Sequence, residues 1–530
     1  RGGLPLAIEL AAAKVRVMSP AEILRRLEDR FALLRGGDRT AHSRHQTLLA
    51  VIDWSWNLLG ERERRALRRL SAFPDGFTLE AAEEVLGADA LDAVEELVAQ
   101  SLLTVGDTGD GVRYRMLETV REFGRMRLEA AGESAEARAA VRAWAVGYAD
   151  RHGARLYSRE QIDAMDRLRA EETNLNDVLR EALADPDPEA VVVLFSSLCG
   201  YWSIRGDFPR SLAFTRAIAS ALTGWRPPPR LLDWTRVALA IALLNAVFFF
   251  HSEDSGPLVS MLSELGSDSA NPKVRAMVTV LLTMVADPEH GFDTLIADPD
   301  PVVRKFALHL QCFTRENSGD PAGAIEAAKA ALHLVGEEDG PWQRAVLNTQ
   351  LASLSAQIGD FAAATRYATE ALPVLERLGD LDDVIQVRAA LAMNAVVEGR
   401  RDEAEQMISE LERLAPRGTY DEVFSAELCR AQLALIDGDI ANGLRMHREA
   451  AERLRRRTVP GTPDAPWTVL GEVLALAAYA QYGEGDDGAD LFERVCAKVS
   501  DVHAVDRRFL DFPAAGMVLA ALGLWGLLKG

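Results

Sequence analysis

A glycine recurs about every 40 residues in the second half of this 530-residue chain, and its spacing constrains the fold more than any other feature. The copies stand between pairs of amphipathic segments, at Gly319, Gly359, Gly399 and Gly438. Glycine supplies the backbone freedom that a tight turn between two helices needs. The spacing therefore predicts a series of helical hairpins.

Small residues recur at fixed distances from these glycines, as expected where helices cross closely. Seven residues before them stand Cys312, Ala352, Ala392 and Ala431, five after them Ala324, Ala364, Ala404 and Gly443, and twelve after them Ala331, Ala371, Leu411 and Ala450. The pattern resembles the tetratricopeptide repeat, stretched from about 34 residues to about 40. Weaker copies lie at Gly206-Asp207 and in residues 466–500, whereas residues 225–310 show no clear register.

Apolar residues recur at three- and four-residue spacing almost throughout, which predicts an all-α chain. The exception is residues 102–116, where two strand-like runs flank a Gly/Asp-rich turn and predict a β-hairpin. Helices are predicted around it at about 61–72, 78–86, 91–101 and 117–131. This order is typical of a winged-helix domain. The expected fold is a superhelix of tetratricopeptide-like hairpins, preceded by a winged-helix domain with a small β-hairpin.

The helix that would recognise DNA in such a domain is residues 91–101. A recognition helix enters the major groove and presents basic or amide side chains. This one carries Asp92, Glu95 and Glu96 and no Lys or Arg, so phosphate would repel it. We expect the domain to pack against a neighbouring domain instead.

The chain carries 59 basic and 80 acidic side chains, a formal net charge of −21, which argues against a surface that binds nucleic acid all over. Residues 151–530 hold −18 of this charge. An acidic concave superhelix favours a basic peptide or protein partner. The longest apolar run, Val237 to Phe250, contains Asn245 and is shorter than the roughly 20 residues of a bilayer span, so we expect no membrane segment.

Motifs that carry catalysis are missing: the chain has no GxSxG, no HExxH and no GxxxxGK(S/T). The one GxGxxG match, residues 483–488, follows a helical pattern, and its three carboxylates would repel a pyrophosphate, so we interpret it as a turn. We expect no enzyme and no metal site. The cysteines are too far apart for CxxC pairs, which favours a reducing cytoplasm; they are Cys199, Cys312, Cys429 and Cys496.

Three local features admit two interpretations each. Trp54 and Trp56 could line a ligand pocket, but their setting favours helical core. Residues 248–251, Phe-Phe-Phe-His, likewise favour core over a small-molecule site. A basic run is either a docking face or a solvated helix face, and both remain open; it comprises Arg62, Arg64, Arg65, Arg68 and Arg69.

Three stretches together resemble a known family. They are Gly3-Leu4-Pro5-Leu6-Ala7-Ile8-Glu9-Leu10, the run from Arg44-His45-Gln46-Thr47-Leu48 to Gly76-Phe77-Thr78-Leu79-Glu80, and Tyr114-Arg115-Met116-Leu117-Glu118-Thr119-Val120. They resemble the second half of the NB-ARC module of bacterial STAND regulators, the signal-transduction ATPases with numerous domains. More narrowly, they are similar to the large SARP-type and LuxR-type actinobacterial transcription regulators. Residues 167–175 resemble the stretch that opens the helical-repeat region of these proteins.

The resemblance implies a switch. In the family, an ATPase core holds ADP in a closed state, a signal sensed by the C-terminal repeats promotes exchange for ATP, and an effector domain then acts. In SARP-type members the effector is an N-terminal DNA-binding domain. The resemblance further implies that two groups of residues lie near the nucleotide. The first is Gly3, Leu4 and Pro5. The second is Met116, Leu117 and Glu118, which stand at the position of the family's Met-His-Asp sensor.

This chain departs from the family in two ways. Leu117 cannot donate a hydrogen bond to a phosphate as His can. The phosphate-cradling loop, with its Lys and its Mg-binding Ser or Thr, is not among these residues. We therefore expect ADP, ATP and Mg to bind only with a further N-terminal half, and the Gly-Leu-Pro of residues 3–5 is here an ordinary helix start.

We expect four segments: 1–57, the end of an NB-ARC helical subdomain; 58–135, the winged helix; 136–310, irregular helical repeats; and 311–530, tetratricopeptide-like repeats. The main hypothesis is the non-catalytic regulatory and sensor portion of a cytoplasmic STAND-type regulator. Its repeats would bind a protein or small-molecule inducer, and its partner would be the ATPase domain of the full-length protein. The alternatives are a free-standing repeat scaffold and a direct DNA-binding winged-helix protein.

Overall fold

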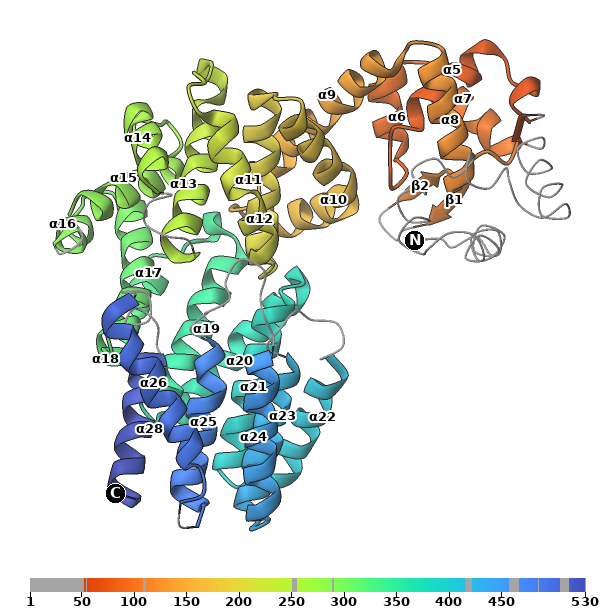
Figure 1. The fold of residues 1–530 in the computed structure, drawn as a ribbon. Coiled ribbons are helices and arrows are strands. Elements are labelled where there is room, and N and C mark those ends of the chain that lie inside the picture. The colour runs from red at the N-terminus through yellow and green to blue at the C-terminus, as the bar shows by residue number, and fades with distance from the viewer. Residues whose placement is uncertain are drawn as a thin grey trace, which may run out of the picture. The chain divides into compact units, whose positions relative to one another are not determined.

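The computed structural model in Figure 1 describes residues 52–53, 55–107, 111–249, 255–287, 290–414, 422–456, 467–484, 486–505 and 514–529. In these ranges the chain is helical apart from one two-stranded sheet, which confirms the predicted fold class. The chain divides into two compact units, the first with residues 1–148 and 171–181, the second with residues 149–170 and 182–530. The boundaries of the four segments expected above stay predictions.

The first unit has the winged-helix order that the sequence predicts. The wing consists of β1 (Thr104–Asp107) and β2 (Val112–Arg115), which pair antiparallel with Val105 opposite Tyr114. Tyr114 also bridges to Phe77. The helices around the wing, each within two residues of its predicted bounds, are α5 (Glu61–Leu70), α6 (Leu79–Leu86), α7 (Ala90–Ala99) and α8 (Glu118–Ala130).

Local sequence explains where these helices begin and how they pack. The Thr78 hydroxyl accepts a hydrogen bond from the Ala81 N–H at 3.2 Å and so caps α6. In the core, the Trp56 ring meets Phe123 edge-on, with centroids 5.7 Å apart. This places Trp56 in helical core, as favoured above, while Trp54 lies outside the described residues.

Two further helices contribute residues to both units: α9 (Ser134–Gly153) and α10 (Gln161–Ala184). The second unit continues as a series of helical hairpins, coloured from yellow-green to blue in Figure 1. Gly206, whose φ is 71°, lies in the turn between α11 (Pro188–Ile204) and α12 (Phe208–Leu222), at the predicted weak copy of the repeat. The elements up to residue 296 are α11 (Pro188–Ile204), α12 (Phe208–Leu222), the 3-10 turn η2 (Pro229–Leu231), α13 (Leu232–Phe249), α14 (Ser255–Leu265), α15 (Pro272–Ala286) and α16 (Gly291–Ile296).

The predicted hairpins follow from residue 301. Their helices are α17 (Pro301–Asn317), α18 (Pro321–His333), the 3-10 turn η4 (Glu337–Asp339), α19 (Pro341–Gln357), α20 (Phe361–Leu378), α21 (Leu381–Val397), α22 (Arg401–Leu414), α23 (Glu422–Ile436) and α24 (Ile440–Arg456). Beyond them lie α25 (Trp467–Tyr482), α26 (Ala489–Val505) and α28 (Ala514–Leu528). The described residues 483–484 and 486–488 lie between α25 and α26 in neither helix nor strand, as the interpretation of the GxGxxG match as a turn predicts.

The turn glycines adopt the conformation for which glycine is needed. All four of the recurring glycines have φ between 74° and 86°. The residue after each donates its N–H to the carbonyl five positions earlier at 2.9–3.0 Å, as in a Schellman helix end. Asp360, after Gly359, then accepts the Ala363 N–H at 3.0 Å and caps the next helix. A Gly-Asp pair therefore ends one helix and begins another.

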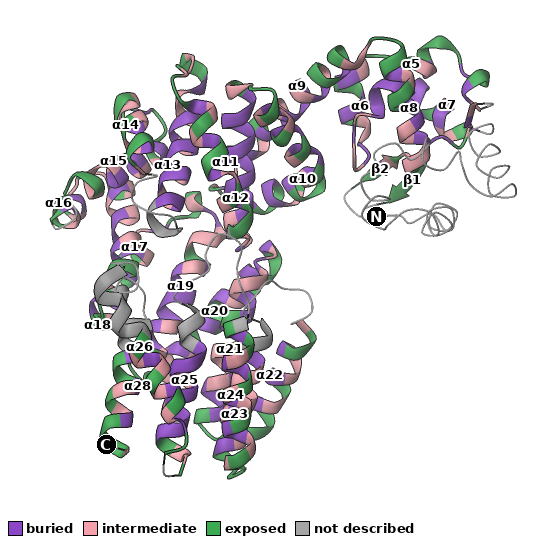
Figure 2. Cartoon of the chain, viewed as in Figure 1, coloured by how far each residue is buried: buried purple, intermediate pink, exposed green. Residues whose placement is uncertain are grey.

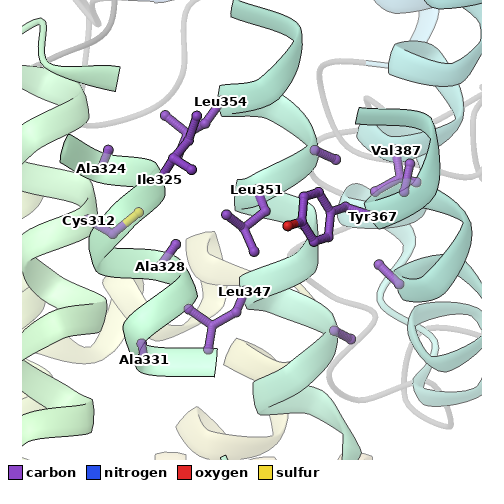
Figure 3. Close-up of a cluster of buried hydrophobic side chains, with 14 of the residues drawn as sticks. Cys312, Ala324, Ile325, Ala328, Ala331, Leu347, Leu351, Leu354, Tyr367 and Val387 are labelled. Atoms are coloured by element: carbon purple, nitrogen blue, oxygen red, sulfur yellow. The ribbon is translucent and has the colours of Figure 1, made fainter. Parts of the chain in front are cut away.

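The small residues around these turns lie in the core, as their spacing predicts. All of those named above are buried. A Cβ at Gly443 would lie 2.6 Å from the Leu435 side chain, so a larger residue at this crossing of α23 and α24 would displace Leu435. Figure 3 shows Ala324, Ala328 and Ala331 of α18 beside the leucines of α19. The buried residues follow the facing sides of the paired helices in Figure 2.

None of the helices within the described ranges combines the length and the apolar character needed to cross a membrane. The four cysteines are free thiols.

Candidate functional site

The helix-turn-helix surface of the first unit is acidic. Residues 71–112 contain ten carboxylates and no Lys, Arg or His. Glu83 of α6 and Asp92 and Glu95 of α7 are exposed. Recognition of DNA by a helix uses Arg, Lys, Asn or Gln at base edges and cations at phosphates. The described surface of α6 and α7 offers no cation for either contact.

The arginine run of α5 is occupied by partners within the first unit. Arg68 is buried and bonds Glu133 at 2.8 Å and Glu61 at 3.0 Å. Arg69 is also buried and pairs with Glu136. Arg68 and Arg69 therefore form neither a docking face nor a solvated helix face, because their ion pairs join α5 to the start of α9. The remaining members bond nearby groups, Arg62 to Glu63, Arg64 to the Trp56 carbonyl and Arg65 to Glu136.

A buried ion pair joins the wing to α10. Arg113 of β2 is 4% exposed, and the side chain of Glu171 in α10 is 1% exposed. The two guanidinium Nη atoms donate to the two carboxylate oxygens at 2.8 and 3.1 Å, a bidentate pair. Burial alone would lower the pKa of Arg113, but the hydrogen bond and charge of Glu171 raise it. The guanidinium therefore stays charged inside the unit.

Asn174 and Gly76 complete this network. Asn174 donates to the Gly76 carbonyl at 3.0 Å and accepts the Asp75 N–H at 3.2 Å. Gly76 has φ at 73°, and a Cβ there would lie 2.3 Å from the Tyr114 carbonyl oxygen. Glycine is the residue that fits this position. The turn at residues 75–76, strand β2 and helix α10 are thus fixed to one another.

The N-terminal part of helix α10 has partners in the second unit. Its residues 171–181 belong to the first unit, and its residues 161–170 to the second. In the second unit, Asp166 accepts a hydrogen bond from Arg377 of α20 at 2.6 Å, which lowers the pKa of Asp166. The Gln161 side chain accepts an N–H from the first turn of α19 at 2.8 Å. Residues of α10 thus form side-chain bonds within each unit, Glu171 with Arg113 in the first and Asp166 with Arg377 in the second.

The residues that the family resemblance places near a nucleotide fall into two groups. Outside the described residues lie Gly3, Leu4 and Pro5. Met116 and Leu117 lie between β2 and α8, and Glu118 is the first residue of α8. Leu117 is 48% exposed, and Glu118 pairs with Arg121 at 2.7 Å. Their nucleotide role stays a prediction. No group of potential metal ligands occurs among the residues that the structure describes.

Sequence reasoning missed the network around Arg113. Residues 167–175, quoted for the family resemblance, include Glu171 and Asn174, but the sequence pattern predicted no partner for either side chain. The one available signal was Arg113 itself, a cation at the end of a long acidic stretch and inside a strand.

A family model and two groups of mycobacterial proteins each match part of this chain. A family model described as a winged helix-turn-helix domain matches residues 59–129. Proteins of Mycobacterium bovis and Mycobacterium tuberculosis, provisionally named HTH-type transcriptional regulators, are 50% identical over 141 residues, which is 26% of this chain and 16% of each relative. A second mycobacterial pair without assigned function is 40% identical over 139 residues, 25% of this chain and 35% of each relative. Most of each relative thus lies outside the match.

Among solved structures, a Rap protein complexed with competence and sporulation factor has a TM-score of 0.40 and 14% identity, covering 57% of this chain and 75% of that one. A STAND protein with a tetratricopeptide repeat sensor, from Pyrococcus horikoshii, has a TM-score of 0.33 and 12% identity, covering 99% and 74%. The winged-helix match and the hairpins described above define the class of this protein. It is a transcription-regulator-like winged helix joined to tetratricopeptide-like helical repeats.

Proposed function

We propose that this chain is the regulatory and sensor portion of a cytoplasmic STAND-type transcription regulator of the SARP-like kind. The observation that carries the proposal is α10, whose residues 161–170 are bonded to the repeats and whose residues 171–181 are bonded to the wing. In this proposal a shift of residues 161–170 displaces residues 171–181 through the backbone hydrogen bonds of the helix. Binding on the repeats would in this way reach the winged helix.

In this proposal the winged helix contacts protein and not DNA. Its acidic helix-turn-helix surface would dock against an ATPase module supplied by other residues, and a separate effector domain would bind DNA. The repeats, with most of the negative charge, would receive a protein or small-molecule inducer. Nucleotide and Mg would be held by the ATPase module. Calorimetry with ADP should therefore show no binding to residues 1–530, and micromolar affinity would contradict this division of labour.

The relay is tested by a change confined to the second unit. Asp166→Asn weakens the bond to Arg377, and we expect faster hydrogen exchange at the β2 amides, by several-fold. Asp437→Asn is the matched control, because it removes an exposed Arg401 pair of similar length in the same unit. Exchange in β2 that is equal in the two variants would contradict the relay. It would instead favour a free-standing repeat scaffold.

Direct DNA binding is the second candidate, favoured by the winged helix-turn-helix model and by the names of the mycobacterial relatives. It predicts a specific gel-shift at physiological salt that weakens steeply as salt rises. The acidic surface of α6 and α7 predicts no such shift. A sequence-specific complex would overturn the protein-contact role of this domain.

A further inference from the structure

A cavity of about 290 Å³ opens in the repeats where α18, α19 and α20 meet. Its wall carries two cations, Lys329 of α18 and Arg366 of α20. Its apolar part includes Ile358 at the end of α19, which is 51% exposed although its side chain is aliphatic. The cavity therefore combines positive charge with an open apolar wall, in a region that is otherwise strongly acidic.

Lys329 and Arg366 differ from the cations around them. Between residues 301 and 414, all described, every other Lys and Arg pairs with a carboxylate or donates to a backbone carbonyl. Within that range neither Lys329 nor Arg366 does so. Arg366 lies over the Tyr367 ring instead, with its guanidinium carbon 4.7 Å from the centroid. This contact uses the face of the guanidinium and leaves its N–H groups for an anion.

The cavity wall also holds one carboxylate, that of Asp360. Asp360 accepts the Ala363 N–H at 3.0 Å as the cap of α20. Among the described residues of this region, Asp360 forms no salt bridge with Lys329 or Arg366. Two cations, one carboxylate that accepts a backbone N–H, and an apolar wall thus line a space of the size that holds a small ligand.

We propose that this cavity binds a carboxylate carried on a short aliphatic group, as at the C-terminal residue of a peptide or in a free aliphatic acid. The carboxylate lies between Lys329 and Arg366, since a guanidinium fork matches carboxylate geometry. The aliphatic group packs against Ile358. As a binding site the cavity stands on its own geometry; only its role as the inducer site rests on the proposed function.

The test uses the whole chain and a matched pair of probes. N-acetyl-leucine carries the carboxylate, and N-acetyl-leucinamide is its neutral counterpart. A ligand of this size in a small cavity is expected to have a Kd on the order of 1 mM, which ligand-observed NMR detects. We expect the amide to bind at least about tenfold more weakly, because one charged contact at each cation is lost. Hexanoate, a third probe, separates the two sources: tighter binding than N-acetyl-leucine indicates a free acid, and weaker binding a peptide terminus.

Variants decide whether the cations carry the binding. Arg366→Gln and Lys329→Gln should each raise the Kd of N-acetyl-leucine about tenfold. Both side chains are exposed, so thermal unfolding should be unchanged. Arg413→Gln is the control, because it removes the same charge from an exposed site outside the cavity. Equal binding of acid and amide, an equal loss in the control, or no binding of any probe would overturn the site. None of these results touches the relay, which is measured at β2 without ligand.

Discussion

Arg113 and Glu171 place a charge pair inside a small helical unit. Taking such ions out of water costs several kcal/mol each, so the pair is stable only when its hydrogen-bonding groups are used. Here the guanidinium also donates to the Asp75 carbonyl at 2.9 Å and to the Gly76 carbonyl at 3.2 Å. Removing one partner leaves an uncompensated buried charge. The wing is therefore sensitive to a single residue of α10.

Glu171→Gln is expected to destabilise the first unit by about 3 kcal/mol, because Arg113 stays charged and buried without its counterion. Hydrogen exchange at the β1 and β2 amides measures the opening of this unit. The control is Arg115→Gln, whose pair with Asp75 is exposed, 3.2 Å long and worth about 0–1 kcal/mol. A cost for Glu171→Gln as small as that of the control would show that the pair does not hold the wing.

Asp380 makes the stability of the repeats depend on pH. It caps α21 and is 1% exposed, and burial, together with the carboxylate of Asp383, raises its pKa. The native state therefore keeps a proton that the unfolded chain loses near pH 4. Its stabilising contribution is complete below that pH and declines as the pH rises toward the raised native value.

Asp380→Asn should accordingly raise the free energy of unfolding near pH 8 and flatten its dependence on pH between about 5 and 8. Asn keeps the acceptor for the Asp383 N–H, so the helix cap survives. Urea unfolding at several pH values measures both effects. Asp360→Asn, at an exposed cap, should leave the slope as it is. If the unfolding free energy of Asp380→Asn depended on pH as steeply as that of the unchanged chain, the Asp380 carboxyl would ionise normally.

At the scale of elements, the hairpins and the wing could be predicted because their signals are local. Gly359 and Asp360 end one helix and begin the next with neighbouring backbone groups. The wing likewise depends on a turn within a short run of residues. The partnership of Arg113 with Glu171 could not be predicted, since 58 positions separate them and a single buried charge has no period. The pairs of Arg68 with Glu133 and of Arg69 with Glu136 were missed for the same reason, because 65 and 67 positions separate the partners.

The repeat spacing makes a prediction about packing in α18. Ala331 is fully buried, and we expect Ala331→Leu to cost about 1–3 kcal/mol because the crossing cannot take the added volume. Ala330→Leu, one residue away and exposed, should change stability by less than about 0.5 kcal/mol. Urea unfolding of the two variants compares them directly. If the two variants lost similar unfolding free energy, the recurring small residues would not mark close helix crossings.

At the scale of the whole molecule, the question is whether α10 transmits a displacement between the two units or whether the units are independent. Asp166 and Asn174 are two helical turns apart, about 12 Å along the axis. Substitutions at that distance normally add within about 0.3–0.5 kcal/mol. If α10 passes a displacement between the units, the effects of changing both residues should not add. Coupling between two sites is also reciprocal, so either unit should report the same value.

The most direct test is a double-mutant cycle of Asp166→Asn and Asn174→Ala, measured by hydrogen exchange at β2 in the first unit and at α20 in the second. A relay through α10 predicts a coupling free energy above about 0.5 kcal/mol that agrees between the two sets of amides. Additivity within about 0.3 kcal/mol at both β2 and α20 would contradict it.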